Sequence, residues 1–484
     1  MKRYIFLLVF LIFSIQLFSA NTFVKTIGGT DHDVVYNGFV KGDAYYFFGY
    51  TYSFSSNMDG YVIKLSTDGT TITEKSIDLG KDELFRSAEL TPEGEFLVIG
   101  YTRQDETSQT DVLVVKLSSD LQVQWSKTIG GPENDSGWEI KPTSDGNYII
   151  SGSTESFGAG DEDVYLIKIN AEGDTLWTRT FGGTREDQGR GCDIDSQGSL
   201  IVAAKAVGLF FSPDMYMVKT DPQGSAIWLK TFATSGWTEG YDVCAVDTCV
   251  VFAGYGYWGS GYSHDMLLVK MNAHGDTMFT RHYGGTDDDY AFGICPTHDG
   301  GFVLTGKSHS FGYSFDGFLC RVDQNGHLQW LYGFGGDEED IFWNVFETTD
   351  HYFVAMGFTE SNTAGGADAF IVKTDSLGLL TSLENPKFIV PQQMQLGQNY
   401  PNPFNPVTSI PFGLKKAQRV EIEIFNAIGK KIVILGGQKF SAGYHVLKWN
   451  GQDAKGAAQA SGIYFYRLVV NGQVLGIKKM NLLR

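Results

Sequence analysis

The residues best suited to contact a ligand lie in three aromatic loops of a repeated region. These loops read AVGLFFSP (206–213), YWGSGYSH (257–264) and SHSFGYSF (308–315). Aromatic rings beside polar side chains can stack on sugar rings or hold a peptide. Packing of the loops against one another is the alternative explanation for the same residues. The candidate ligand-binding residues are Phe210, Phe211, Tyr257, Trp258, Tyr262, His264, His309 and Tyr313.

A second set of chemically capable residues, the carboxylates, recurs too regularly to form a catalytic site. One acid stands five residues before a base in every repeat, and another follows a glycine pair. A catalytic site needs each group once, so we predict that these acids hold the fold together by accepting backbone N–H bonds. The first set is Asp59, Asp111, Asp163, Asp214, Asp265, Asp316 and Asp368. The second is Asp33, Glu83, Asp135, Asp187, Asp289 and Asp340, with Glu239 displaced by one position.

The sequence predicts no cofactor. GFVLTGKS (301–308) satisfies the P-loop pattern, but that loop needs a helix after it, and this segment aligns with the second strand of a repeat. The motifs G-x-S-x-G and H-E-x-x-H are missing, and the five cysteines are too scattered for a zinc site. A ring of carboxylates could bind calcium, although EF-hand-like spacing is lacking. Cys244 and Cys249 flank a predicted turn and could form a cross-strand disulfide or remain two buried thiols.

The elements that must position these residues are internal repeats. The glycine-pair position falls at 28, 78, 130, 182, 233, 284 and 335, with degenerate copies at 78 and 233, so the repeats are 50 to 52 residues apart. Each copy contains four β-rich patches separated by Gly, Asp and Asn turns, and the glycines are expected to permit tight turns with positive φ. Four strands in about 51 residues fit one blade of a β-propeller. We therefore predict an all-β fold with seven blades over residues 21–380, in which the N-terminal strand TFVKTIGG completes the last blade.

The two ends of the chain point to export. Residues 1–20 combine Lys2 and Arg3 with an apolar run and small residues, which is the plan of a secretory signal peptide, and no further spanning segment is found. Residues 387 onward carry 13 Lys and Arg against 3 Asp and Glu, a formal charge of +10. Because the whole chain has a formal charge of −19, residues 1–386 carry −29. An acidic body argues against nucleic acid as a partner.

Residues 394–484 differ from the repeats in composition and sequence pattern, and they follow a linker at 381–393. LGQNYPNPFNPVTSIPF is rich in proline, and the alternating strands after it predict a small β-sandwich. Together with VEIEIFNAIGKKI, GYHVLKWNGQD, ASGIYFYRL and KKMNLLR, it resembles the type A sorting domain of the bacterial type IX secretion system. It is also similar to the immunoglobulin-like module of flagellar hook-capping proteins. The sorting motif comprises Asn399, Tyr400, Pro401, Asn402, Pro403, Phe404, Asn405 and Pro406.

The resemblance implies passage through the periplasm, recognition by outer-membrane secretion machinery, and a final place on the cell surface or in the medium. We therefore expect an exported binding or adhesion module for a glycan or a protein. The alternatives are a secreted polysaccharide-active hydrolase or lyase and a purely structural surface role. A propeller fold is compatible with all three, because fold does not determine function.

Overall fold

The computed structural model describes most of the chain and contains strands throughout. The described residues are 22–104, 108–207, 213–234, 236–257, 263–285, 287–311, 314–363, 365–380, 387–388, 394–397, 399, 402–414, 416–440 and 443–483. Within these ranges the secondary structure is all β with no helix, and hence no helix that could cross a membrane. The predicted signal peptide, residues 1–20, lies outside the described ranges.

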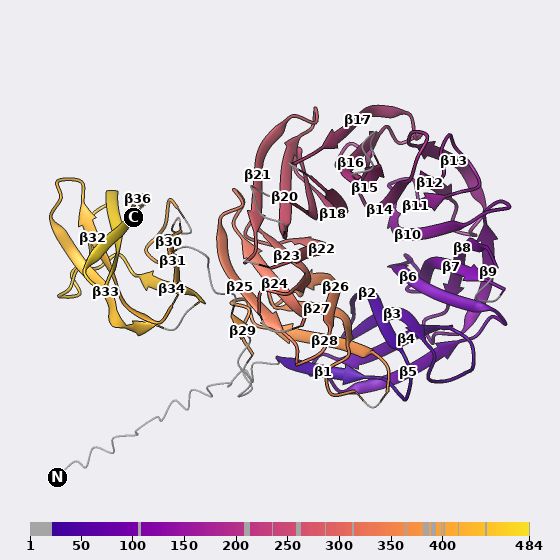
Figure 1. The fold of residues 1–484 in the computed structure, drawn as a ribbon, viewed down its shortest axis with the longest axis horizontal. Helices are drawn as coiled ribbons and strands as arrows, with labels where there is room; N and C mark the ends of the chain where they lie inside the picture. The colour runs from indigo at the N-terminus through magenta and orange to yellow at the C-terminus, as the bar shows by residue number, and fades with distance from the viewer. Residues whose placement is uncertain are drawn as a thin grey trace, which may run out of the picture.

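The repeats form antiparallel sheets, each made of strands consecutive in the chain. They are β2–β5 (Asp33–Lys41, Ala44–Thr51, Asp59–Ser66, Thr71–Ile77), β6–β9 (Asp82–Leu90, Phe96–Arg103, Thr110–Leu117, Val123–Ile129), β10–β13 (Asp135–Pro142, Tyr148–Thr154, Asp163–Ile169, Thr175–Phe181), β14–β17 (Asp187–Ile194, Leu200–Val207, Pro213–Thr220, Ala226–Phe232), β18–β21 (Thr238–Val246, Cys249–Tyr257, His264–Asn272, Thr277–Tyr283) and β22–β25 (Asp289–Pro296, Phe302–Ser308, Asp316–Val322, Leu328–Phe334). The sheets surround a common axis with the first strand of each innermost, so the repeats build a β-propeller (Figure 1).

The ends of the repeated region meet in one sheet. Strands β26–β28 (Asp340–Glu347, Phe353–Thr359, Asp368–Thr374) are completed by β1 (Phe23–Ile27), which pairs antiparallel with β28. This pairing confirms the predicted role of the N-terminal strand, and it covers an edge that would otherwise be open. Strand β29 (Lys387–Phe388), within the predicted linker, adds to β25. The P-loop-like segment forms strand β23, as the repeat alignment predicted.

Neighbouring sheets are joined by the acid that follows the glycine pair. Asp33 Oδ2 accepts the Gly29 N–H at 2.7 Å, and the same bond recurs from Gly131, Gly183, Gly285 and Gly336 to the acid four residues later. The backbone N–H of Asp33 also donates to Ala367 O, next to Asp368 on the preceding sheet. The predicted structural role of these acids is thus confirmed, and each such bond links one sheet to the next.

In most pairs the first glycine is required for space and not for an unusual φ, whereas Gly284 has a φ of +159°. A Cβ added to Gly130 would overlap the carboxylates of Asp111 and Asp135, and one on Gly182 would overlap Asp163 and Asp187. Neither glycine has a positive φ, so that part of the expectation is wrong for these two pairs. The glycine leaves room for two carboxylates, one from each sheet, to lie against the same backbone.

Glu239 corrects a second expectation. Thr238, and not Glu239, occupies the junction position in its repeat, where its hydroxyl donates to Phe232 O at 3.2 Å. Glu239 instead forms a buried ion pair with Arg190 at 2.8 Å and accepts the indole N–H of Trp237 at 2.8 Å. A one-residue displacement along a strand moves a side chain to the opposite face. Glu239 therefore points away from the sheet junction, toward Arg190, and does not hold that junction.

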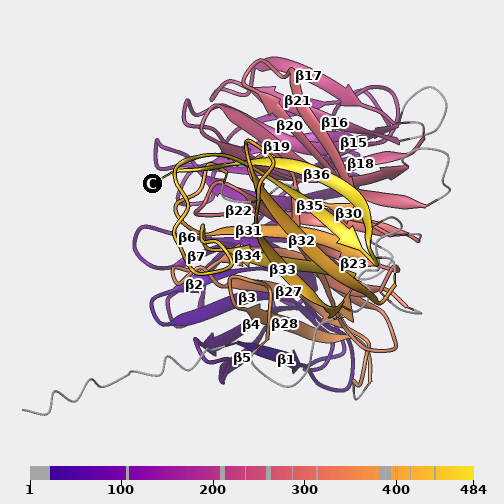
Figure 2. The same ribbon diagram turned by 90° about the vertical axis from the view of Figure 1, so that its left-hand side faces the viewer.

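Residues 394–483 form two further sheets. One contains β30 (Gln395–Leu396), β31 (Thr408–Leu414) and β34 (Gly443–Trp449), and the other contains β32 (Gln418–Asn426), β33 (Lys431–Phe440), β35 (Gly462–Val470) and β36 (Gln473–Leu482). A shared apolar core that includes Trp449 and Tyr466 lies between them. The unit lies beside the propeller near β25, as Figures 1 and 2 show from two directions.

The described part of the sorting motif has a buried half and an exposed half. The Asn399 N–H donates to Tyr466 Oη at 2.7 Å, and Phe404 is buried against Trp449 with its backbone paired to Asn481 and Leu483. The exposed residues of the motif are Asn402, Pro403, Asn405 and Pro406, while Tyr400 and Pro401 lie outside the described ranges. The motif thus ties the lead-in segment to the last strand and leaves a polar surface beside it.

All five cysteines are free thiols. In the hairpin of β18 and β19, Cys244 lies opposite Val251 and Cys249 lies opposite Val246, so the two thiols do not face each other directly. Of the two possibilities that the sequence left open, the thiol form is therefore present, with Cys244 buried and Cys249 half-buried.

Because of the paired junction carboxylates, we expect the propeller to be more stable at acidic pH. Burial, with a smaller contribution from the opposing carboxylate, raises the pKa of Asp368 to about 6 and that of Asp289 to about 7. A folded pKa above the unfolded value of about 4 means that the folded state binds the proton more tightly. The resulting stability is complete below about pH 4 and is lost as the pH rises through the folded pKa. We expect the free energy of unfolding in urea to be lower at pH 7.5 than at pH 5.

Between the same two pH values, the free energy of unfolding of Asp368→Asn should fall by on the order of 1 kcal/mol less than that of the unsubstituted chain, because the asparagine side chain cannot ionise. Asp120→Asn, at an exposed turn, is the control and should follow the unsubstituted chain. An equal pH dependence in all three proteins would contradict the assignment of the raised pKa to the junction.

Candidate functional site

The aromatic loops are only partly within the described residues. Phe210, Phe211, Trp258, Tyr262 and Tyr313 lie outside them, whereas Tyr257, His264 and His309 are described. The structure brings Tyr257 and His264 together as stacked rings with centroids 4.2 Å apart. His309 lies against Phe315, whose ring in turn contacts Tyr290.

His264 is held by a small polar network. Its Nδ1 lies 3.0 Å from Asp288 Oδ1 and 3.2 Å from the hydroxyl of Tyr290. Its backbone N–H also donates to Asp288 Oδ1 at 2.8 Å. The side chain therefore positions the start of β20, which is the packing role that the sequence left open, and its Nε2 is buried with no hydrogen-bond partner among the described residues.

This cluster continues inward to the propeller axis. Tyr290 packs edge-on against Tyr255 at 4.6 Å, and Tyr255 contacts Tyr241 at 5.6 Å. Tyr241 then packs on Phe292 at 4.7 Å. A largely buried aromatic cluster thus runs from the loop end at Tyr257 down to the innermost strands.

At the axis, one residue from each innermost strand forms a closed ring, here named the channel belt. Every member lies at a β-bulge, which turns its side chain toward the axis. The members are Tyr36, Arg86, Trp138, Arg190, Tyr241, Phe292 and Trp343, at the same 50-to-52-residue spacing as the repeats.

The belt is closed because each member contacts the next. The Arg86 guanidinium lies 4.2 Å from the Tyr36 ring and 4.0 Å from that of Trp138, and Arg190 lies 5.6 Å from Trp138 and 3.6 Å from Tyr241. Phe292 stacks on Trp343 at 4.8 Å, and Trp343 returns to Tyr36 at 5.4 Å. Two cations between aromatic faces are favourable, and more so where water is excluded. The centre of the propeller is therefore filled by aromatic rings and two arginine side chains, and not by apolar residues alone.

A cavity of about 40 Å³ lies against the belt, and on five of the innermost strands the residue after the belt member contributes a polar side chain to it. It is lined by Tyr36, Asn37, Arg86, Ser87, Trp138, Glu139, Gly191, Tyr241, Asp242, Phe292, Trp343 and Asn344. Two buried atoms of this lining have no hydrogen-bond partner among the described residues, the indole Nε1 of Trp343 and the Oδ1 of Asn37. One is a donor and the other an acceptor, and a hydroxyl group can pair with either kind of atom.

Two carboxylates on the cavity wall differ in their surroundings. Glu139 pairs with Lys141 at 2.8 Å and accepts the Cys192 N–H at 2.6 Å. Asp242 accepts the N–H groups of Val243 at 2.7 Å and Ile294 at 2.9 Å. Burial, followed by the negative charge of Glu139, nevertheless raises the pKa of Asp242 well above its ordinary value. The cavity therefore combines an ion-paired carboxylate with one that holds its proton more tightly.

A group of carboxylates bears on the expectation for calcium. Oxygen atoms of Asp59, Asp78 and Glu83 lie within 4.8 Å of one another at the first sheet junction. The carboxylate oxygens of Glu83 accept the backbone N–H groups of Leu79 and Lys81, and burial raises the pKa of Glu83 to about 7. These contacts fit the structural role of the junction acids.

The channel belt was missed by the sequence analysis, although a signal for it exists. The junction position is the one that carries the acid in most repeats. Three residues after it, every copy has an aromatic residue or an arginine and never an aliphatic residue. Reading each repeat position separately would have identified the belt.

The fold defines the class of protein, a β-propeller followed by a second all-β unit. No family model matches the chain. A stretch of 142 residues is 28% identical to the regulatory protein FlaEY of Caulobacter vibrioides, covering 26% of this chain and 14% of that protein. The chain thus matches only a small part of the curated relative's length.

Solved structures similar to this chain include other propellers. PorZ, a surface component of the type IX secretion system of Porphyromonas gingivalis, is 11% identical, with 94% of this chain and 71% of that chain covered and a TM-score of 0.35. The propeller domain of the Trilobed protease from Pyrococcus furiosus is 11% identical over 75% of this chain and all of that chain, with a TM-score of 0.43. The Pan2 WD40 domain of Neurospora crassa is 8% identical over 73% and 96%, with a TM-score of 0.45. At these TM-scores the likenesses carry no argument about function.

Proposed function

We propose that this protein is an exported, seven-bladed β-propeller that binds an extracellular glycan at its central channel. The observation that carries the proposal is the unpaired donor of Trp343 and unpaired acceptor of Asn37 in one aromatic-lined cavity. Sugar hydroxyls both donate and accept, and sugar rings stack on aromatic faces, so a glycan matches both features. The cavity admits a hydroxyl-bearing group and a few waters, and the rest of the ligand lies along the aromatic cluster toward Tyr257.

Other cavity groups fit the same ligand class. Arg86 supplies fixed donors, whereas Glu139, Asp242 and Asn344 supply acceptors. Recognition by a few convergent polar groups within an aromatic wall is typical of small-ligand sites. A protein ligand, the other expectation from the sequence, would have to present a side-chain hydroxyl or amide at the same place.

The test is a glycan-array screen of the full mature chain, followed by calorimetry with the strongest ligand. Trp343→Phe keeps an aromatic ring in the belt but removes the N–H, so it should weaken binding roughly 5- to 20-fold, the value of one hydrogen bond. Trp177→Phe is the matched control, because Trp177 lies on the outermost strand β13 beneath Arg179. It should bind as the unsubstituted chain does. Absence of any bound glycan, or equal affinity in both variants, would contradict the proposal.

A polysaccharide-active enzyme is the second candidate, on the basis of Glu139 and Asp242 on one cavity wall. Glycosidases use one protonated and one ionised carboxyl group, and the raised pKa of Asp242 fits the proton donor. Release of shorter sugars from a bound glycan, lost in Asp242→Asn, would favour this candidate over simple binding.

We further propose that residues 394–484 are an immunoglobulin-like sorting domain for the type IX secretion system, which places the propeller on the cell surface or in the medium after export through the periplasm. The resemblance of five ordered motifs supports this assignment. The exposed half of the sorting motif offers a surface for outer-membrane machinery, while Phe404 and Asn399 maintain the fold.

Delivery can be tested with a fluorescent reporter that carries a signal peptide and residues 394–484, expressed in a bacterium with this secretion system. We expect the reporter outside the outer membrane. Asn405→Ala, at an exposed motif position, should leave more reporter in the periplasm, because it changes the proposed contact surface without entering the core. Ile428→Ser, at a turn residue that is 86% exposed, is the control and should be exported normally. Periplasmic retention of the parent reporter would contradict the assignment.

A further inference from the structure

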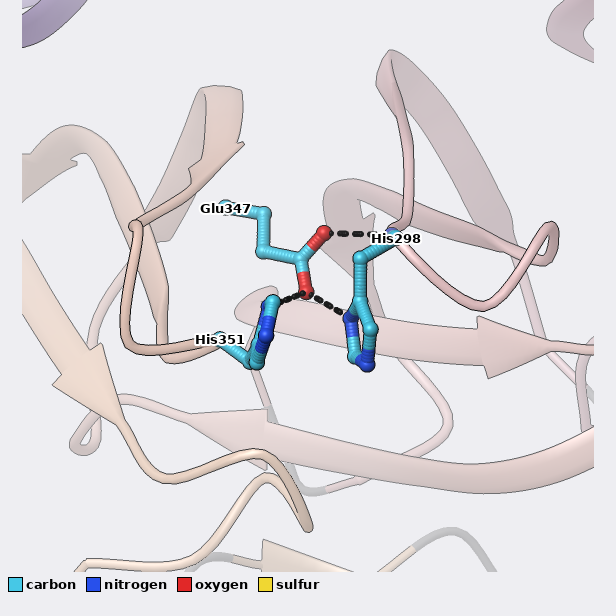
Figure 3. Close-up of side chains that lie close together, drawn as sticks. All are labelled: His298, Glu347 and His351. Carbon is cyan, nitrogen blue, oxygen red and sulfur yellow. Dashed lines mark hydrogen bonds and ion pairs between the residues drawn. The ribbon is translucent and has the colours of Figure 1, made fainter.

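Two neighbouring turns of the propeller bring two imidazoles and a carboxylate together outside the channel. His298 lies in the turn between β22 and β23, His351 in the turn between β26 and β27, and Glu347 at the end of β26 (Figure 3). Turns between the first and second strands lie at the opposite end of the sheets from the loops that carry Tyr257 and His309. The cluster is thus separate from the proposed glycan site.

The three side chains converge on a single oxygen atom. Glu347 Oε1 lies 2.5 Å from His298 Nδ1 and 3.2 Å from His351 Nδ1, and the two imidazole rings stack with centroids 3.5 Å apart. Glu347 Oε2 accepts the backbone N–H of His298 at 2.8 Å, which fixes the carboxylate. Each histidine side chain is 48% exposed and that of Glu347 only 10%, so the cluster is open to solvent on the imidazole side.

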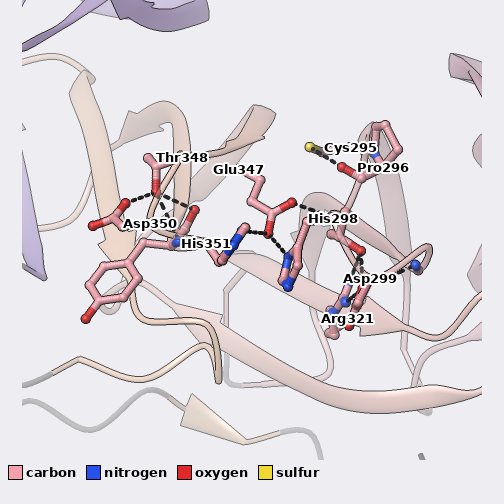
Figure 4. A network of polar contacts seen from close by, with 12 residues as sticks. Cys295, Pro296, His298, Asp299, Arg321, Glu347, Thr348, Asp350 and His351 are labelled. Carbon is pink, nitrogen blue, oxygen red and sulfur yellow. Dashed lines mark hydrogen bonds and ion pairs between the residues drawn. The ribbon is translucent and has the colours of Figure 1, made fainter. Parts of the chain in front are cut away.

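Both turns are held rigidly. In the first, Arg321 donates to Asp299 and to the Thr297 hydroxyl. In the second, the Thr348 hydroxyl donates to Asp350 and accepts the Tyr352 N–H at 3.0 Å (Figure 4). The imidazoles are therefore presented by a fixed backbone, which is the condition for a preorganised ligand set.

His351 stands at a position where the equivalent turns use glycine. Its φ is +63°, and the matching residues Gly94, Gly146, Gly198 and Gly300 have φ between +79° and +83°. A residue with a Cβ is less stable than glycine in this left-handed conformation. Histidine in place of glycine therefore lowers the intrinsic stability of this turn and directs an imidazole to Glu347.

We propose that His298, Glu347 and His351 bind a divalent transition-metal ion of the zinc class. Zinc takes imidazole nitrogen and carboxylate oxygen at about 2.0–2.2 Å, so tetrahedral ligand atoms lie about 3.3 Å apart. The three ligand atoms already lie within 4.8 Å of one another, so one ion can contact all three once the side chains rotate about it. Binding through Nδ1 places each imidazole proton on Nε2. The mixed nitrogen and oxygen set disfavours calcium and magnesium, which prefer oxygen alone.

The metal would join two sheets at the closure of the ring. His298 belongs to the β22–β25 sheet, whereas Glu347 and His351 belong to the sheet that β1 completes. An ion bound only in the folded state stabilises that state by mass action. Zinc should therefore act as a clamp between these two neighbouring sheets.

The test uses the untagged full mature chain, dialysed against chelator and then titrated with zinc chloride at pH 7.5. We expect one zinc per chain by calorimetry and a saturable rise in Tm of a few degrees, with no rise when calcium chloride replaces zinc. His351→Gly should bind zinc at least 10-fold more weakly and lose the rise in Tm. Its zinc-free Tm should be no lower than that of the parent, because glycine suits the backbone there.

Glu347→Gln should also abolish the zinc-dependent rise. His327→Gln is the matched control, since His327 pairs with Asp323 in another turn at 3.0 Å and lies outside the cluster. It should retain the full response. The proposal is overturned if the parent shows no zinc-dependent change, or if His351→Gly and His327→Gln respond alike.

Discussion

The propeller depends on the contact between a buried carboxylate and the backbone of a glycine pair at the sheet junctions. The acid accepts the N–H of the second glycine, and its own backbone binds the preceding sheet, so one residue joins two sheets. The first glycine has no Cβ because two carboxylates lie against it. Burial, with a smaller contribution from the neighbouring carboxylate, raises the pKa values of Asp289 and Asp368, so these two junctions are strongest when the acids are protonated.

This constraint separates positions that repeat from positions that are free to vary. Junction residues are nearly identical in most copies, whereas a bulge just beyond them turns one side chain per sheet toward the axis. The channel belt uses this freedom, with aromatic rings and two arginines in a closed set of contacts. The belt positions therefore differ from sheet to sheet, whereas the junction positions largely repeat.

The sequence predicted the propeller well because its physical causes are local and repeated. Turn glycines, alternating strands and the junction acids recur at a nearly constant spacing, and β1 pairs with β28 as expected. The reason for the glycine pair was misjudged, since steric contact with Asp368 and Asp33 depends on a neighbouring sheet that the sequence does not place. Glu239 was misassigned because a one-residue shift reverses the facing of a strand side chain.

The site was harder to predict for the same reason. The aromatic loops attracted attention as unusual local sequences, yet Tyr257 and His264 are only the outer end of a cluster whose inner part is spread over seven distant segments. His351 likewise shows its significance only beside Glu347, because a histidine in place of a turn glycine gives no sign of what it will face.

The most direct test of the account is a crystal structure of the full chain with the strongest glycan from the array. The account predicts electron density for a sugar in the channel cavity, with one hydroxyl within hydrogen-bond distance of both Trp343 Nε1 and Asn37 Oδ1. Density for the sugar on the outer strands or on the C-terminal sandwich, with only water in the cavity, would contradict it.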